Sequence, residues 1–161
     1  MYTLFFMSLT IFIVYLTVSL MSFGVPTSLS ETYYHWEEKG RDLGILFTSF
    51  IWGMTFPLMI VWIEVLPNDQ NFIPFIASAS LMFVGAASAF KASLTNEVHF
   101  TAALIAALAS YIWAFAYGIP AIAFATFVLS MVGVVVNKDN KIFWLEMGAF
   151  ANIYVQLLPL L

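Results

Sequence analysis

Most of the chain consists of six apolar stretches, each long enough to cross a membrane as a helix. A spanning helix needs about 20 mostly apolar residues. The run 101–136 would measure about 54 Å as one helix against a bilayer core of about 30 Å, and Gly118-Ile119-Pro120 divides it. The sequence therefore predicts an all-α, polytopic transmembrane bundle of six helices, forming a single domain over residues 1–161, at about 3–23, 43–66, 72–90, 99–117, 120–136 and 142–161.

The composition supports a membrane protein. Apolar residues make up 63% of the chain and charged residues only 9%, against roughly 25% charged in soluble domains. So much apolar surface must face lipid, so we expect membrane lipids as partners. The chain has no basic patch that would favour nucleic acid. It has no cysteine for disulfides or thiolate ligands. The composition leaves the oligomeric state open.

All five Lys and Arg residues fall in alternate loops. Six helices place the loops 24–42, 91–98 and 137–141 on one side of the membrane. Because cytoplasmic loops are enriched in Lys and Arg, we expect this side to be cytoplasmic and both termini to lie outside. The cations are Lys39, Arg41, Lys91, Lys138 and Lys141.

Small residues are concentrated in the third and fourth stretches. In lipid, helix interfaces favour small residues because they let backbones approach closely. We therefore expect 72–90 and 99–117 to form a central, closely packed pair, and we interpret their small residues as packing rather than as the lining of a pore. The residues include Ala77, Ser78, Gly85, Ala103, Ala106 and Ser110.

Three stretches carry polar residues at helical spacing, and such stripes should face inward because polar groups are costly in lipid. The stripes include Ser8, Tyr15 and Ser22 in the first helix, His99 and Ser110 in the fourth, and Glu146, Asn152 and Gln156 in the sixth. Several of these residues lie near the loops that carry the cations. The pattern predicts one polar pocket at that interface, between the first, second, fourth and sixth helices.

We expect Arg41 to bind an anionic headgroup. The other predicted ligand-binding residues are Tyr34, His99, Glu146, Asn152 and Ser22. If the protein is an enzyme, the candidate acid–base residues are His99, Glu146 and Asp42.

Structural roles are open for the same residues. His99 could bond a loop carbonyl, Glu146 could pair with Lys141 or Arg41, and Asp42 could cap the second helix.

The sequence predicts no cofactor. A divalent metal would require His35 and His99 to converge from separate elements, because no pair of histidines has metal-ligand spacing within one helix.

Two segments resemble a known family. They are Ser28–Tyr34 with Gly40–Gly44 in the first loop, and Asn96–Ala103, where a histidine precedes small residues at the start of a helix. They are similar to six-helix membrane proteins of the DRAM / FGF-receptor-activating-protein type and their bacterial relatives. The resemblance implies a six-helix bundle with a cytoplasmic N-terminus, and eukaryotic members are linked to autophagy and to remodelling of GPI-anchor lipids. A more distant likeness is to the alkaline-ceramidase-like superfamily, whose zinc site needs three histidines where this chain has two.

Three functions are compatible with the sequence. The first is recognition of a lipid or amphiphile in an interfacial polar pocket. The second is a membrane-embedded hydrolase that modifies lipids, and the third is a small transporter or channel, which requires a polar path through the whole bilayer.

Overall fold

The structure is a computed structural model that describes residues 1–40, 42–88 and 94–161. Within these residues the chain forms seven α-helices and no β-strand, which confirms the predicted all-α bundle. The helices are α1 (Tyr2–Phe23), α2 (Thr32–Lys39), α3 (Ile45–Glu64), α4 (Phe72–Ser88), α5 (Leu94–Ala116), α6 (Pro120–Val136) and α7 (Lys141–Leu157). Short 3-10 turns join or follow them at Leu29–Glu31, Asn68–Gln70, Lys138–Asn140 and Leu158–Leu160.

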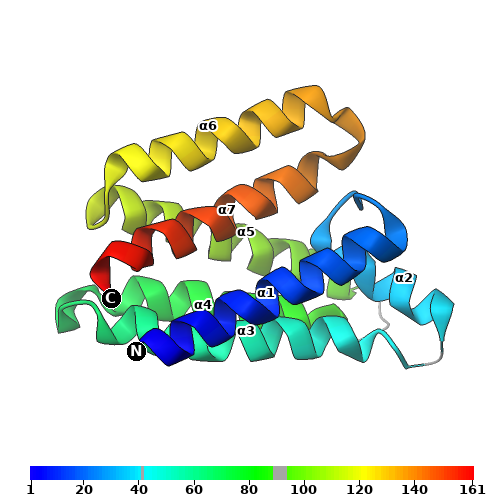
Figure 1. Ribbon diagram of the computed structural model, residues 1–161, viewed down its shortest axis with the longest axis horizontal. Coiled ribbons are helices and arrows are strands. Elements are labelled where there is room, and N and C mark those ends of the chain that lie inside the picture. Colours follow the sequence, from blue (N-terminus) through cyan, green and yellow to red (C-terminus); the bar gives the residue numbers. More distant parts are fainter. Residues whose placement is uncertain (41, 89–93) are drawn as a thin grey trace.

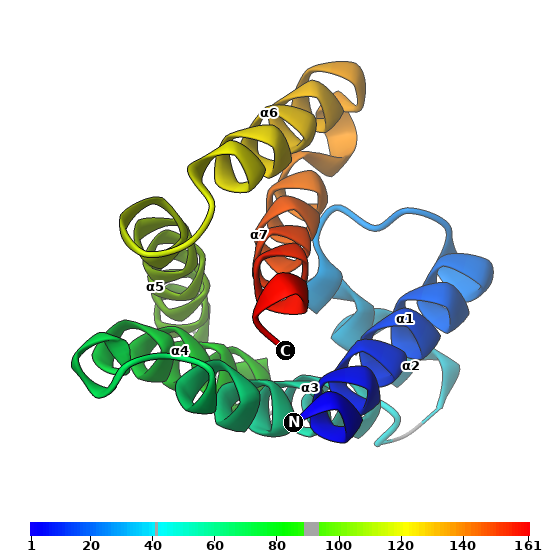
Figure 2. The same cartoon turned by 60° about the vertical axis from the view of Figure 1, so that its left-hand side comes forward.

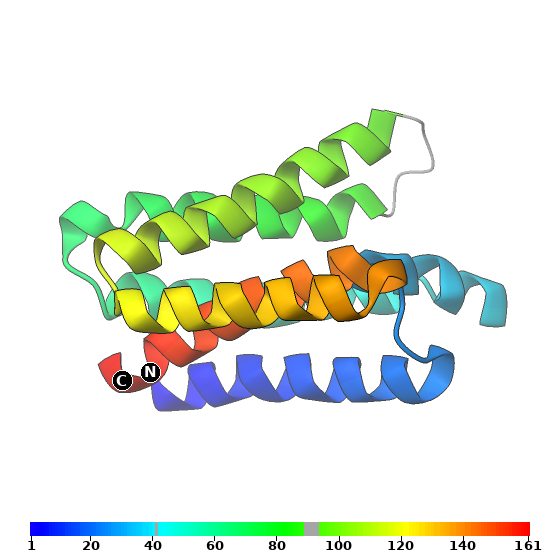
Figure 3. The same ribbon diagram turned by 90° about the horizontal axis from the view of Figure 1, so that it is seen from above.

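The long helices lie side by side and alternate in direction along the chain (Figure 1). The two chain ends lie together at one end of the bundle, and the short helix α2 lies at the other end (Figures 1 and 3). Figure 2 shows α7 towards the middle, with α1, α3, α4, α5 and α6 around it. Helix α4 packs against both α3 and α5, while α7 packs against α5 and α6.

The first loop is more ordered than the sequence predicts. Within the segment 24–42, a 3-10 turn at Leu29–Glu31 leads directly into α2. The Ser28 hydroxyl accepts a hydrogen bond from the Glu31 N–H at 3.2 Å, which caps the turn. Thr32 and Tyr33 are buried on the inner side of α2. Contacts with the rest of the bundle therefore stabilise a helix whose own sequence is too polar and too short to indicate one.

Helix boundaries differ from the predicted ones mainly in the fourth and sixth stretches. Helix α5 begins at Leu94, ahead of the expected start at 99. Helix α7 ends at Leu157 and continues only as a 3-10 turn containing Pro159. Between α5 and α6 the chain turns where Gly118 and Pro120 indicate. Ile119 is extended there, and Pro120 occupies the first turn of α6, where its missing N–H costs no hydrogen bond.

Three helices of the described chain are long and apolar enough to cross a membrane: Tyr2–Phe23, Ile45–Glu64 and Glu97–Ala116. Phe72–Ala87 and Pro120–Val136 are apolar but shorter. The outward faces of these helices expose large apolar side chains, among them Phe56, Phe75, Phe83, Phe100, Phe124 and Leu129. Exposed apolar surface on this scale supports association with a membrane.

Polar side chains inside the bundle form hydrogen bonds between helices. The Ser8 hydroxyl of α1 donates to the Met54 carbonyl oxygen of α3 at 2.8 Å and lies 2.7 Å from the Tyr154 hydroxyl of α7. On the same face of α1, the Tyr15 hydroxyl lies 2.7 Å from the Thr32 hydroxyl of α2. The polar stripe of the first helix thus faces inward and is used to hold α1 against its neighbours.

Gln156 clamps the turn between α5 and α6. Its Oε1 accepts from the Ile119 N–H at 2.8 Å, and its Nε2 donates to the Ile119 carbonyl oxygen at 2.9 Å. Gln156→Leu should lower the free energy of unfolding by about 1–2 kcal/mol, because both backbone groups lose their partner near a water-exposed turn. Thermal unfolding in detergent measures the effect. Val155→Leu, at an exposed site on the same helix, is the control, and equal melting temperatures for the two variants would contradict the clamp.

Candidate functional site

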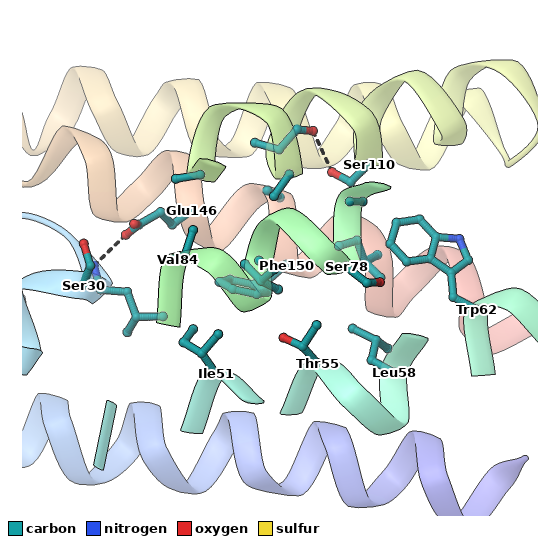
Figure 4. A pocket seen from close by; sticks show the side chains of 18 of the residues that line it. Ser30, Ile51, Thr55, Leu58, Trp62, Ser78, Val84, Ser110, Glu146 and Phe150 are labelled. Atoms are coloured by element: carbon teal, nitrogen blue, oxygen red, sulfur yellow. Dashed lines mark hydrogen bonds between the residues drawn. The ribbon is translucent and has the colours of Figure 1, made fainter. Parts of the chain in front are cut away.

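A narrow cavity runs along the inside of the bundle between α3, α4, α5 and α7 (Figure 4). The volume that is open to the centres of water molecules is about 60 Å³. Because one water needs about 10–15 Å³ by this measure, the cavity can hold a short file of waters. It extends over about four turns of α3, whose lining residues recur every three or four positions. They are Phe47, Ile51, Thr55, Leu58 and Trp62.

Small side chains make room for the cavity. Where larger residues would interdigitate, the facing walls of α4, α5 and α7 carry alanines and serines, which leave space between closely packed backbones. The predicted close packing of 72–90 against 99–117 is present, since α4 and α5 run against each other. The same residues also line the cavity, a role that we did not predict: Ala77, Ser78, Ala103, Ala106 and Ser110, with Ala149 of α7.

The end of the cavity nearest the chain termini is closed by two tryptophans. Trp62 of α3 and Trp113 of α5 meet edge to face, with ring centroids 4.9 Å apart. Both side chains are fully buried, and neither indole N–H has a hydrogen-bond partner among the described residues. Among the described residues, the lining of this end therefore includes the aromatic Trp62 and no ionisable group.

The opposite end of the cavity contains Glu146 and is covered by the first loop. The Glu146 carboxylate accepts a hydrogen bond from the Leu29 N–H at 2.6 Å (Figure 4). Leu29 and Ser30 of the loop complete the lining beside it. Glu146 is the ionisable residue that lines this cavity in the described chain.

The first loop is attached to the start of α7 at further points. The Phe143 N–H donates to the Thr27 carbonyl oxygen at 3.0 Å. The Asn140 side-chain amide donates to the carbonyl oxygens of Val25 and Pro26 at 2.8 and 2.9 Å. Together with the Glu146 contact, these bonds fix the loop as a cover over one end of the cavity.

Hydroxyl groups lie midway along the cavity. Thr55 of α3, Ser78 of α4 and Ser110 of α5 all line it, and Figure 4 shows them between Glu146 and Trp62. The Ser110 hydroxyl donates to a carbonyl oxygen of its own helix at 2.7 Å. The Thr55 hydroxyl is buried and has no hydrogen-bond partner among the described residues. An unpaired buried hydroxyl is costly, so this position can gain from a polar ligand atom.

Of the predicted site residues, Glu146 lines the cavity. Asn152 does not line it, but it is fully buried on the same helix, with its Nδ2 donating to the carbonyl oxygen of the lining residue Ser110 at 3.4 Å. The Asn152 Oδ1 has no partner within the described residues. Both residues belong to the inward-facing stripe expected for the sixth helix.

Four other predicted residues do not line the cavity. Ser22 lies in the last turn of α1, and Tyr34 is 56% exposed on α2. Asp42 is exposed and has a left-handed backbone with φ of 65°. The His99 ring nitrogen Nδ1 lies 3.2 Å from the Val84 carbonyl oxygen, so its partner is a carbonyl of α4. Arg41, the expected ligand of an anionic headgroup, lies outside the described residues.

The two histidines lie on different elements. His35 of α2 stacks on Phe23 and lies 3.9 Å from Glu31 and 3.8 Å from Glu38, whereas His99 lies on α5. In the described ranges no group of three or more His, Cys, Asp or Glu side chains is arranged to hold a metal ion.

The cavity differs from the predicted pocket in one helix, because α4 takes the place of α1. Two polar groups of α1 are already used for contacts, since Ser8 bonds Met54 and Tyr15 bonds Thr32. The run of small residues in 72–90 was the sequence feature that could have indicated the wall formed by α4, but close packing of helices is sufficient to explain such a run.

Comparisons of the chain with protein-family models, with curated proteins and with solved structures find no match.

Proposed function

We propose that this chain is a six-span integral membrane protein whose internal cavity binds the hydrocarbon chain of a membrane lipid or other amphiphile. The observation that carries the proposal is the cavity itself, which is narrow, elongated and almost wholly apolar, with Glu146 as the one carboxylate among its described lining residues. An apolar tunnel with polar groups at its mouth matches an amphiphile, whose tail gains from burial while its headgroup needs hydrogen bonds.

The six-span topology is supported by the distribution of charge. Lys39, Lys138 and Lys141 lie at the end of the bundle opposite the chain termini, while Asp69 lies on a turn at the terminal end. The positive-inside rule then makes the lysine-bearing end cytoplasmic. Helices as short as α4 and α6 can span by local thinning of the bilayer.

This topology predicts the labelling of introduced cysteines, for which the cysteine-free chain is well suited. Lys39→Cys and Lys138→Cys should resist a membrane-impermeant maleimide in intact cells and react after permeabilisation. Asp69→Cys should react in intact cells, because its turn lies on the other side. Labelling of positions 39 and 138 from opposite compartments would rule out the six-span arrangement.

Two alternative functions have less support. A channel needs a polar path through the bilayer, but the Trp62–Trp113 pair closes the cavity with aromatic side chains. A hydrolase needs a nucleophile beside a base. Thr55, Ser78 and Ser110 lie deeper in the described lining than Glu146, and the Ser30 hydroxyl beside Glu146 pairs with the Ser28 hydroxyl at 3.1 Å.

A matched pair of substitutions on α7 tests the proposal. Ala149 lines the cavity, and Ala151 is exposed on the outer surface of the same helix. Ala149→Leu should reduce co-purified lipid by at least about tenfold, because the added carbons fill a space that holds only a short file of waters. Ala151→Leu should retain wild-type lipid. Mass spectrometry of lipids extracted from the purified proteins gives the amounts.

A second variant separates loss of the cavity from a folding defect. Ala106→Leu fills the cavity from the opposite wall, and thermal unfolding of all three variants shows which are folded. Wild-type lipid retention in both cavity variants, folded and purified alike, would contradict the proposal.

A further inference from the structure

We infer that the cavity selects a neutral single-chain lipid, in which an ester or amide joins one acyl chain to a small hydroxyl-bearing headgroup. This inference depends on the proposed function and specifies the ligand of the same cavity. It follows from three features: the width of the cavity, the carboxylate at its mouth and the unpaired hydroxyl midway along it.

The width admits one chain. Its walls are closely packed helices, and the open volume of about 60 Å³ is spread over about four turns of α3. A second acyl chain or a fused ring would require α4 and α5 to separate, although they pack along their length. Two-chain lipids should therefore bind poorly.

Glu146 sets the chemistry of the headgroup. One of its oxygens accepts the Leu29 N–H, and a carboxylate has acceptor capacity beyond one bond. A headgroup hydroxyl can donate to it, whereas a carboxylate or phosphate headgroup would lose its hydration beside a described lining that supplies no cation, which is costly. The mouth therefore favours a neutral donor over an anion.

Thr55 sets the chemistry of the linkage. Its hydroxyl is a buried donor without a partner in the described residues, and its side chain belongs to the cavity wall (Figure 4). Helices α3 and α7 begin at the same end of the bundle. Thr55 is ten residues beyond the start of α3 and Glu146 five beyond the start of α7, so Thr55 lies deeper in the cavity than Glu146 (Figure 4). A short hydroxylated headgroup spans this depth, which brings the ester or amide carbonyl oxygen to Thr55.

Trp62 lies seven residues, or about 10 Å, beyond Thr55 on α3, so the probes for the test carry eight-carbon chains. They are radiolabelled monooctanoylglycerol, octanol, octanoate and dioctanoylglycerol, each bound to the full chain in detergent. Wild-type protein should prefer monooctanoylglycerol. Thr55→Val removes the hydroxyl and keeps the shape, so it should weaken monooctanoylglycerol by about tenfold and leave octanol, which has no carbonyl, unchanged. Thr17→Val, at an exposed position on α1, is the matched control and should change neither.

The mouth is tested separately with Glu146→Gln. The amide can still accept the Leu29 N–H and adds an N–H donor that a carboxylate headgroup can accept, so octanoate should gain affinity relative to monooctanoylglycerol. Equal effects of Thr55→Val on octanol and monooctanoylglycerol, or tight wild-type binding of octanoate or dioctanoylglycerol, would overturn the inference. If Ala149→Leu abolishes binding of every probe while Thr55→Val changes none, only the ligand assignment fails; if Ala149→Leu has no effect on any probe, the proposed function fails too.

Discussion

Replacing Gly148 by alanine should loosen α6 from α7 and lower the free energy of unfolding by about 3 kcal/mol, at the top of the range for overpacking. A Cβ at position 148 would lie 2.5 Å from the Ser130 Cβ and 2.8 Å from the Ser130 Oγ. Because the Ser130 Cβ is fixed by its backbone, a rotamer change cannot relieve the contact and the helices must move apart. Thermal unfolding in detergent measures the loss.

Two further variants isolate this cause. Gly53→Ala is the control, since its added Cβ would meet only Ile11 at an ordinary 3.7 Å, and alanine is the better helix former. Ser130→Gly combined with Gly148→Ala should recover much of the lost stability, because it removes the atom that clashes. Equal melting temperatures for Gly148→Ala and Gly53→Ala would contradict the close approach of α6 and α7.

The long helices were predictable because each is encoded locally. An apolar run of membrane-spanning length, ended by Gly118 and Pro120 or by a polar turn, needs no knowledge of its neighbours. Helix α2 was not predictable, since its eight residues are mostly polar and its stability depends on burial of Tyr33 and Thr32 against elements distant in the sequence. Helix length and apolar content therefore indicate which helices can be predicted from the local sequence alone.

The site was only partly predictable for the same reason. Glu146 could be found because an ionisable residue in an apolar stretch is rare and costly, and Asn152 because it shares the helical stripe. Docking of the first loop and α4 decides where two other predicted residues lie. Tyr34 lies on an exposed face, and His99 lies beside the Val84 carbonyl. Periodicity within one helix carries no information on such docking.

Small residues illustrate a different limit. Alanines and serines at positions 77, 78, 103 and 106 have the same pattern whether the opposing helix fills the space or leaves it open. Which outcome occurs depends on the other two helices that surround the same space, here α3 and α7. The cavity is a property of four helices together, and a reading of one or two helices favours packing.

Glu146→Ala should release the cover over the cavity. The Leu29 N–H would lose its acceptor at 2.6 Å, and a buried donor left without a partner costs about 1–3 kcal/mol. Hydrogen exchange of the amides from Leu29 to Glu31 should accelerate by at least about tenfold, whereas the amides of α7 should keep their protection. Glu146→Gln should behave like the wild type in this measurement, because its amide oxygen can accept the same bond.

A variant at a second attachment of the first loop distinguishes a local effect at Leu29 from general loosening of the loop. Asn140→Ala removes the bonds to the Val25 and Pro26 carbonyl oxygens, which lie earlier in the loop, so it should leave the Leu29 amide largely protected. Unchanged exchange at Leu29 in Glu146→Ala would mean that Phe143 and the loop's own turn suffice to hold the cover closed. With acceleration confined to Glu146→Ala, the carboxylate that faces the cavity would also be the group that closes it, so a headgroup competing for Glu146 would itself favour opening.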